Sequence, residues 1–365
     1  MSRGPSSPCE GVGSARWRGT EPICTVSLLR LTGISLLLVA GCAGPGPREV
    51  APNPPVTATF NAVGDILLSR GVARAIERSG DPQHPFRQLN TALEAVDFNF
   101  GNLESPVSGD DSQIADGLRF NTRVSHLAGL VEYDFKIVNL ANNHALDQGV
   151  DGLVNTWRLL EAHGIRHVGT GPDLDSAWQP RYVEANGIRF GFIGASYTAF
   201  NDRGRRPSDQ IARINDHERL PRAVRQARAD SDFVVVTMHA GREYVRRPDR
   251  TQIDFARRAI DAGADIVIGA HPHWIQTIEA YRGKWIFHSL GNFIFDQRKP
   301  GTNEGLMLRI AVQREAGPGS PVALARIDLL PLIIEATVPR LATAAESSAI
   351  LQKIGLTEDF LLPPP

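Results

Sequence analysis

Short apolar runs alternate with amphipathic stretches from Thr57 onward. Runs rich in β-branched and aromatic residues predict strands at 58–63, 98–101, 136–140, 189–195, 233–238, 265–269, 285–288 and 305–312. Helical spacing of apolar residues predicts helices at 69–79, 85–95, 150–163, 216–228 and 249–262. This alternation predicts an α/β fold in which helices cover a largely parallel sheet.

The alternation stops near residue 300. Residues 322–334 predict a long strand that Pro331 breaks, because proline lacks the N–H that a ladder needs. Thr343 and Glu346 have the spacing of a capping box, which predicts a terminal helix over 343–354. We therefore expect one main domain over 57–300, completed by the strands and helix of 301–365.

Two stretches, 104–118 and 197–211, fit neither period and are expected to be loops. The second loop carries Arg203, Arg205 and Arg206. These arginines could form a rim for an anionic substrate, and we assign Arg205 to substrate contact. A solvated loop is the commoner explanation for such residues.

The first 42 residues have the features of a targeting segment. Arginines precede an apolar run, Leu31 to Ala40, that is too short to span a bilayer. Val39-Ala40-Gly41-Cys42 resembles a bacterial lipobox, in which the cysteine becomes the lipidated first residue. We expect a lipoprotein signal peptide over 1–41, then a lipidated Cys42 and a Pro/Gly-rich tether over 42–56. The alternative is a buried apolar strand beside an ordinary cysteine.

Composition limits the chemistry of the folded part. The net charge is −1, which offers no basic excess for sequence-independent binding of nucleic acid. All three cysteines lie within the first 42 residues, so the rest of the chain has neither a thiolate ligand nor a cysteine nucleophile. Any metal there must be held by nitrogen and oxygen ligands.

Polar residues follow several of the predicted strands. Asp65 follows the first strand, and Asn102 and Glu104 follow the second. Ligands in open α/β sheets bind at the carboxyl ends of strands, so such residues can converge from distant parts of the chain. Each of these signals is weak by itself, because Gly64-Asp65 is also a turn dipeptide.

The third strand runs into Asn142-Asn143-His144, which is hard to explain by packing. An amide oxygen can ligate a hard cation, and an adjacent imidazole can move a proton. Asp147 could orient that imidazole or cap the following helix. We assign His144 and Asp147 to catalysis.

Later strands deliver histidines. His239 ends one strand, and His271 and His273 follow the next, separated by a proline that stiffens the backbone. Three histidines at two strand ends indicate a metal site that activates water. Glu243 and Asn292, near the same strand ends, are assigned to substrate contact. The sequence has no Gly-x-Ser-x-Gly elbow, P-loop or dinucleotide fingerprint.

Six blocks in this order resemble the CapA family of poly-γ-glutamate capsule synthesis, a branch of the calcineurin-like metallophosphatase superfamily. They are Gly64-Asp65-Ile66-Leu67, Gly101-Asn102-Leu103-Glu104-Ser105-Pro106, Asn139-Leu140-Ala141-Asn142-Asn143-His144-Ala145-Leu146-Asp147, His239-Ala240-Gly241-Arg242-Glu243-Tyr244, Gly269-Ala270-His271-Pro272-His273 and Ser289-Leu290-Gly291-Asn292-Phe293-Ile294-Phe295-Asp296. The resemblance implies a four-layer α/β/β/α sandwich with two central sheets.

The resemblance also implies roles for single residues. It places one or two divalent ions, with Mn, Fe and Zn all open, among Asp65, Asn102 or Glu104, Asn143, His239, His271 and His273. It makes His144 the proton donor to a leaving group. Two departures remove ligands from one ion: Leu67 replaces the histidine of the Asp-x-His block, and Asn102 or Glu104 replaces the bridging aspartate. We therefore expect one tightly bound ion and a second, weaker one.

Three functions fit this sequence. The first is a metal-dependent hydrolase or transferase that acts at the cell surface on an anionic polymer, which the resemblance implies to be poly-γ-glutamate. The second is an accessory subunit of a capsule synthase or exporter, without turnover. The third is an envelope phosphodiesterase. All three place the protein outside the cytoplasm, held to a membrane through its lipid.

Overall fold

The computed structural model describes residues 54–112, 117–197, 208–317, 319–356 and 361–362. The predicted signal peptide, Cys42 and the tether up to residue 53 lie outside this range, as does Arg205. No helix of the described residues is long and apolar enough to cross a membrane.

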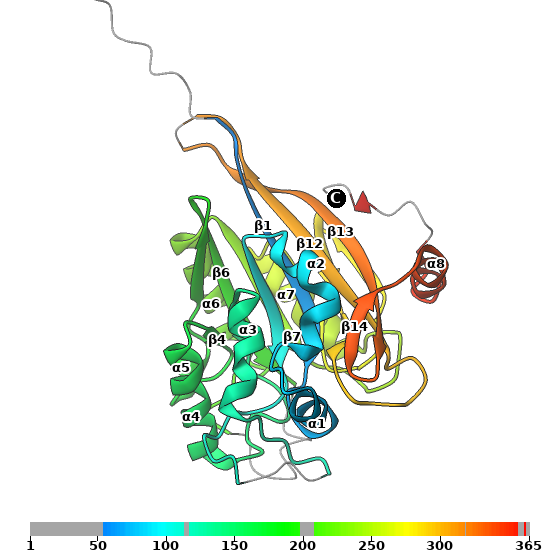
Figure 1. Ribbon diagram of the computed structural model, residues 1–365. Coiled ribbons are helices and arrows are strands. Elements are labelled where there is room, and N and C mark those ends of the chain that lie inside the picture. Colours follow the sequence, from blue (N-terminus) through cyan, green and yellow to red (C-terminus); the bar gives the residue numbers. More distant parts are fainter. Residues whose placement is uncertain (1–53, 113–116, 198–207, 318, 357–360, 363–365) are drawn as a thin grey trace, which may run out of the picture. The chain divides into compact units, whose positions relative to one another are not determined.

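Two mixed β-sheets form the centre of the fold (Figure 1). The first has the order β14-β13-β12-β1-β2-β3-β4, in which β1 to β4 run parallel and β12 to β14 antiparallel. Its strands are β1 (Val56–Ile66), β2 (Phe98–Leu103), β3 (Phe135–Asn139), β4 (Arg166–Val168), β12 (Glu304–Arg314), β13 (Val322–Glu335) and β14 (Val338–Leu341). Two short strands lie off this order: β11 (Asn292–Ile294) pairs with β1, and β15 (Leu361–Leu362) pairs with β13.

The second sheet has the order β5-β6-β7-β8-β10-β9. Its four middle strands are parallel, and its two edge strands are antiparallel to their neighbours. The strands are β5 (Arg181–Ala185), β6 (Ile188–Ser196), β7 (Phe233–His239), β8 (Ile266–Ala270), β9 (Ile278–Tyr281) and β10 (Lys284–Phe287). Both sheets are thus mixed, and the expectation of one largely parallel sheet is corrected, because antiparallel strands extend one side of the first sheet and both edges of the second.

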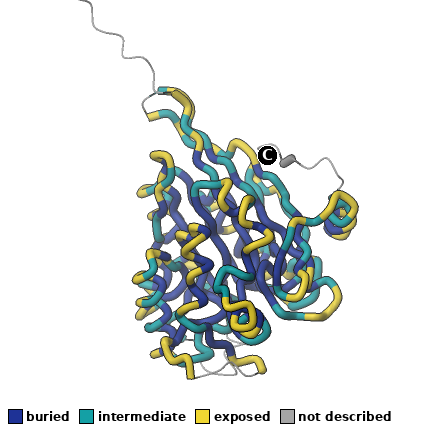
Figure 2. The backbone as a smooth tube through the Cα atoms, in the orientation of Figure 1, coloured by how far each residue is buried: buried dark blue, intermediate teal, exposed yellow. Residues whose placement is uncertain are grey.

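An aromatic core holds the two sheets together. Phe60 and Phe98 of the first sheet stack with their ring centroids 5.0 Å apart. Phe190 and Phe192 of the second sheet meet Phe60 edge-on, at 5.5 and 6.1 Å. All four rings are buried, as Figure 2 shows for the strands that carry them. Aromatic pairs of this kind stabilise a core beyond the area that they bury.

Helices cover the outer face of each sheet. Apolar residues of α1 (Arg70–Ser79), α2 (Asn90–Glu94), α3 (Ala128–Glu132) and α4 (Gly149–Ala162) form one buried cluster with the first sheet. A second cluster joins the other sheet to α5 (Leu174–Ala177), α6 (Arg219–Asp230) and α7 (Arg250–Ala262). The predicted four-layer α/β/β/α sandwich is therefore confirmed. The predicted helix at 85–95 is instead the 3₁₀ helix η1 (His84–Leu89) followed by α2.

The C-terminal part differs from expectation at Pro331. The strand β13 runs through this proline without a break, and Pro331 lies opposite Leu306 of β12. The ladder to β14 begins only at the next residue, Leu332, so the missing N–H falls where no partner strand needs it. The helix α8 (Ala344–Gln352) begins with the predicted Thr343–Glu346 capping box.

A close approach of two backbones fixes the carboxyl end of β1. Asp65 N–H donates to Gly291 O at 3.1 Å, and a Cβ on Gly64 would lie 1.9 Å from that oxygen. Gly64→Ala must therefore push β1 from the chain at Gly291, and we expect a loss of about 2–4 kcal/mol in the free energy of unfolding. Denaturant unfolding measures this loss.

Gly80→Ala is the control for this prediction, because Gly80 has a left-handed φ of 66° and no atom within 4 Å of an added Cβ. It should cost only the backbone strain, about 1–2 kcal/mol. Only the Gly64 variant should also displace Asp65 and reduce bound metal. Equal effects of both variants on stability and on metal content would show that the contact with Gly291 is unimportant.

Candidate metal centre

The carboxyl ends of parallel strands from both sheets meet at one edge. Asp65 is the second-last residue of β1, and Glu104 follows β2 directly. His239 ends β7, and His271 and His273 follow β8. All five side chains are buried, the most exposed being His273 at 4%. The fold thus gathers residues from opposite sheets into one polar cluster, as the strand-end rule predicts.

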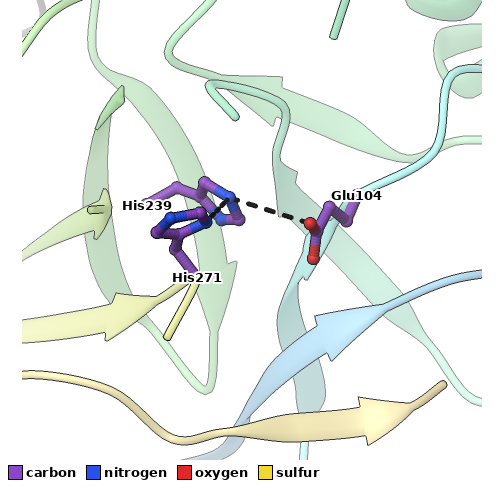
Figure 3. A group of neighbouring side chains, drawn as sticks. All are labelled: Glu104, His239 and His271. Carbon is purple, nitrogen blue, oxygen red and sulfur yellow. Dashed lines mark hydrogen bonds and ion pairs between the residues drawn. The ribbon is translucent and has the colours of Figure 1, made fainter. Parts of the chain in front are cut away.

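Histidine nitrogens and amide oxygens lie very close together in this cluster. His239 Nε2 is 3.1 Å from His271 Nδ1 and 2.7 Å from Asn143 Oδ1. Figure 3 shows both imidazoles turned toward each other and His239 turned toward Glu104. Burial lowers the pKa of both histidines, that of His271 well below its usual range. Neutral imidazole is the form that binds metal.

Glu104 lies at the centre of the cluster without a hydrogen-bond donor. Both of its carboxylate oxygens are buried and lack a partner among the described residues. Oε1 lies 3.7 Å from His144 Nε2, 3.9 Å from His239 Nε2 and 4.0 Å from His273 Nε2. Burial, with the charges of Asp65 and Glu243, raises the pKa of this carboxyl well above its usual range. A buried carboxyl group of this kind needs a proton or a cation.

Asp65 is bound from several sides. It accepts the backbone N–H of His271 at 3.2 Å and lies 3.4 Å from His273 Nδ1 and 3.6 Å from His239 Nδ1. Although burial opposes ionisation, His239 and His273 hold the pKa of Asp65 well below its usual range. Asp65 is therefore a fixed negative charge at the base of the cluster.

The donor set fits a divalent cation. One atom from each of Glu104, His239 and His271 lies within 4.8 Å of the others, and the same is true of Asp65, Glu104 and His273. Carboxylate oxygens and imidazole nitrogens are common ligands of Mn, Fe and Zn ions. The two groups share Glu104, so the arrangement suits one ion or two. Among the described residues, the two oxygens of Glu104, which both groups contain, have no hydrogen-bond partner and are open to a cation.

The backbone around these ligands is unusual. His271 and His273 have left-handed φ angles of 100° and 56°. Such angles are uncommon for residues with a Cβ and cost about 1–3 kcal/mol each. Pro272 between them has a fixed φ, so the segment presents both imidazoles to the cluster in one rigid arrangement.

Asn102, a candidate ligand in the sequence, hydrogen-bonds to the carboxylate of Asp65. Its Nδ2 donates to Asp65 Oδ1 at 2.8 Å, and its Oδ1 accepts from Asn139 Nδ2 at 2.8 Å. Asn102, within β2, thus positions Asp65. Glu104, which follows β2, offers the cluster oxygens without a hydrogen-bond donor among the described residues.

His144 and Asp147 form a pair at the rim. His144 Nδ1 donates to Asp147 Oδ2 at 2.7 Å, which leaves Nε2 toward Glu104. The ring of Phe120 stacks on the imidazole with centroids 3.8 Å apart, and its backbone N–H donates to Asp147. Asp147 therefore orients His144, and α4 has no side-chain cap. Of the two roles expected for Asp147, the structure has the orientation of His144 and not the capping of α4.

Two residues predicted to contact substrate lie near the cluster. Asn292 Oδ1 accepts from His273 Nδ1 at 2.9 Å, and its Nδ2 donates to Gln297 and to Thr302 O. Because these bonds use its whole amide, Asn292 fixes the ring of His273 in place. Glu243 is half-buried and close enough to raise the pKa of Glu104.

Sequence reasoning missed the aromatic residues around the cluster. The ring of Tyr197 lies 4.6 Å from His271, and those of Phe295 and Tyr244 lie 4.9 and 6.1 Å from His273. Tyr197 follows β6 directly, so the strand-end rule that found His239 could have found it. Phe295 has no such signal, since an apolar residue after a strand predicts packing.

Comparisons with known proteins identify the family of this chain. The model of the family described as bacterial capsule synthesis protein PGA_cap matches residues 59–297. The capsule biosynthesis protein CapA of Bacillus anthracis is 30% identical over 296 residues, which cover 79% of this chain and 70% of that protein. The PGA biosynthesis protein CapA of Bacillus subtilis is 32% identical over 283 residues, 76% of this chain and 72% of that one.

A solved structure, the calcineurin-like phosphoesterase YfkN of Bacillus subtilis, aligns with 82% of this chain and 97% of its own. The sequence identity is 12% and the TM-score is 0.47. This likeness is too distant to carry an argument about function.

Loss of one histidine should empty the proposed metal site. His239→Ala and His271→Ala should each remove at least one bound ion per chain, because each deletes a buried nitrogen donor. Metal bound to the folded state at a hundredfold excess over Kd adds about 2.7 kcal/mol, so the melting temperature in metal-containing buffer should fall as well. Elemental analysis and calorimetry, with and without chelator, measure both effects.

His217→Ala is the matched control, because His217 is exposed and belongs to neither group of candidate ligands. It should leave metal content unchanged. Full metal occupancy in both the His239 and the His271 variants would show that the metal has been placed wrongly.

Proposed function

This chain belongs to the bacterial capsule synthesis protein PGA_cap family, and from that membership we propose that it acts in capsule synthesis. The proposed activity is metal-dependent cleavage or transfer on an anionic polymer, poly-γ-glutamate, at the cell envelope. Capsule synthase subunits are the expected protein partners. The observation that carries the proposal is Glu104, whose two buried oxygens lack any donor and face three histidines.

The cluster supplies the ligands that the reaction needs. Asp65, Glu104, Asn143, His239, His271 and His273 would hold the metal. A divalent ion bound there supplies Lewis-acid activation of the bond to be broken. Asp65 balances the positive charge, and Asn102 holds that carboxylate through its 2.8 Å hydrogen bond.

His144 is positioned to move a proton. Its Nδ1–H is held by Asp147, so the free Nε2 faces the cluster. An imidazole oriented in this way can give a proton to a leaving group at neutral pH. Phe120 covers one face of the ring, which restricts its rotation.

A specific observation favours a second function, that of an accessory subunit without turnover. Leu67, where the superfamily pattern has a histidine, is buried against Phe120 and Phe295. This apolar cluster offers no ligand on that side of the site. One ion could then serve to hold the fold or the polymer.

The proposed location is the outer side of the cell envelope. The lipobox-like Val39-Ala40-Gly41-Cys42 supports a lipid anchor at Cys42. Stable anchoring needs more than one acyl chain, which a lipidated N-terminal cysteine can carry.

His144→Ala separates an enzyme from an accessory subunit. The variant should keep its fold and metal, yet lose about 10²–10⁴-fold in rate, because a general acid contributes that much. Turnover of γ-glutamyl peptides and of aryl phosphodiesters, measured side by side, also tells which bond is cleaved. Asp147→Asn should lose part of this rate and change the pH profile, since Nδ1 would no longer face a carboxylate.

The capsule phenotype decides between the two functions. If capsule formation survives in His144→Ala and is abolished in Asp65→Ala, His144 is not catalytic. The accessory subunit then becomes the better assignment.

Cys42→Ser tests the anchor. The variant should accumulate as unprocessed precursor or be released as soluble protein, because the lipid-bearing thiol is lost. Acyl labelling and cell fractionation measure the result, with Cys24→Ser as the matched control. Normal acyl labelling of Cys42→Ser would refute the assignment.

A further inference from the structure

A groove of about 730 Å³ lies beside the metal cluster. It is bounded by α1, by the chain from Phe295 to Pro300, and by the turn between β13 and β14. Figure 1 shows these elements at the same end of the first sheet. None of the proposed metal ligands lines it.

The groove is strongly basic. Arg74, Arg78, Arg298 and Lys299 line it, and all four are exposed. None of the four has an ion pair within the described part of the chain. The single acidic lining residue, Asp296, is already paired with Arg70 and accepts the backbone N–H of Gly71. The groove therefore has an excess of positive charge that nothing in its walls neutralises.

Two of these cations repeat along one helix. Arg74 and Arg78 are four residues apart in α1, so they lie on the same face, about 6 Å apart along the axis. Like charges at this spacing destabilise a helix. An anionic ligand that carries charges at a similar interval would relieve this repulsion.

Residues that line the groove contact residues of the metal cluster. Phe295 lies 4.9 Å from the ring of His273. Gln297 accepts from Asn292, which in turn holds His273, and donates to Tyr244 Oη at 3.4 Å. Lys299 Nζ lies 3.5 Å above the ring of Tyr244. A chain in the groove would thus pass directly beside the metal ligands.

The third wall of the groove is the turn between β13 and β14, which contains an unpartnered polar atom and an uncommon backbone conformation. Thr337 Oγ1 is buried and has no hydrogen-bond partner in the described structure. Ala336 and Thr337 have φ angles of 46° and 84°, a conformation that favours Asn-Gly in such a two-residue turn. Asn303, also in this wall, is exposed.

We propose that this groove binds a polycarboxylate chain and leads it to the metal cluster. The inference rests on the proposed function and names the surface by which the polymer is held. Each γ-linked glutamate unit carries one free carboxylate and spans five backbone bonds, about 6 Å when extended, so several carboxylates fall within reach of the four cationic side chains. The carboxylates of the polymer suit the guanidinium groups, and its amides suit the polar side chains of the third wall.

The test compares two double variants of the full-length chain. Arg74→Ala/Arg78→Ala removes the repeated cations and keeps good helix formers in α1. Arg225→Ala/Arg258→Ala makes the same charge change on the exposed faces of α6 and α7, in the opposite helical layer. The probe is an end-labelled γ-linked glutamate oligomer, measured by fluorescence anisotropy over a range of salt concentrations.

The α1 variant should bind the oligomer about tenfold more weakly and with less dependence on salt, because two exposed charge pairs are lost. The α6/α7 variant should bind like the wild type. An uncharged γ-linked glutamine oligomer should not compete. Unchanged binding by the α1 variant would overturn the proposal, as would equal competition by inorganic polyphosphate of the same total charge.

The groove and the proposed function can fail separately. If the α1 variant binds normally while His144→Ala loses turnover, the groove is wrong and the enzyme assignment stands. If the wild type binds the oligomer in a salt-dependent way and never cleaves it, the groove stands and the hydrolytic function is wrong.

Discussion

The structure depends on two buried carboxyl groups that lie in one cluster, Asp65 and Glu104. Glu104 has no donor for either oxygen, and Asp65 lies in the same cluster. Two carboxyl groups in an apolar setting repel each other and cannot both be ionised without a cation. Burial lowers the pKa of His239 and His271, and His273 lies within reach of both carboxyl groups. The edge where the sheets meet is therefore compatible with a divalent cation.

The rest of the fold holds this edge rigid. The aromatic core fixes the two sheets against each other, so ligands from β1 and β7 keep a constant separation. The contact between Gly64 and Gly291 fixes the end of β1, and the buried amide chain from Asp65 through Asn102 to Asn139 fixes its carboxylate. The supports come from strands of both sheets and from the chain before β11.

Periodicity predicted the alternation of strands and helices, and strand-end residues predicted the convergence of His239, His271 and Asp65, because these signals are local. The two-sheet sandwich was implied by the family resemblance and not by the periodicity. Local signals could not predict which atom of an amide faces a metal. Asn102 and Asn292 lie near the ligands, yet both use their amides to hold other residues. Pro331 misled for a similar reason, since the cost of a missing N–H depends on the partner strand. The basic groove beside α1 could not be predicted from the sequence either, because the residues that line it are distant in sequence.

The strand β1 has a consequence for access. It carries the chain from Val56 to Asp65, about 30 Å at the rise of a strand, so the segment that precedes Val56 joins the domain at the end remote from the cluster. If the protein is anchored through that segment, the length of β1 lies between its anchor and the cluster.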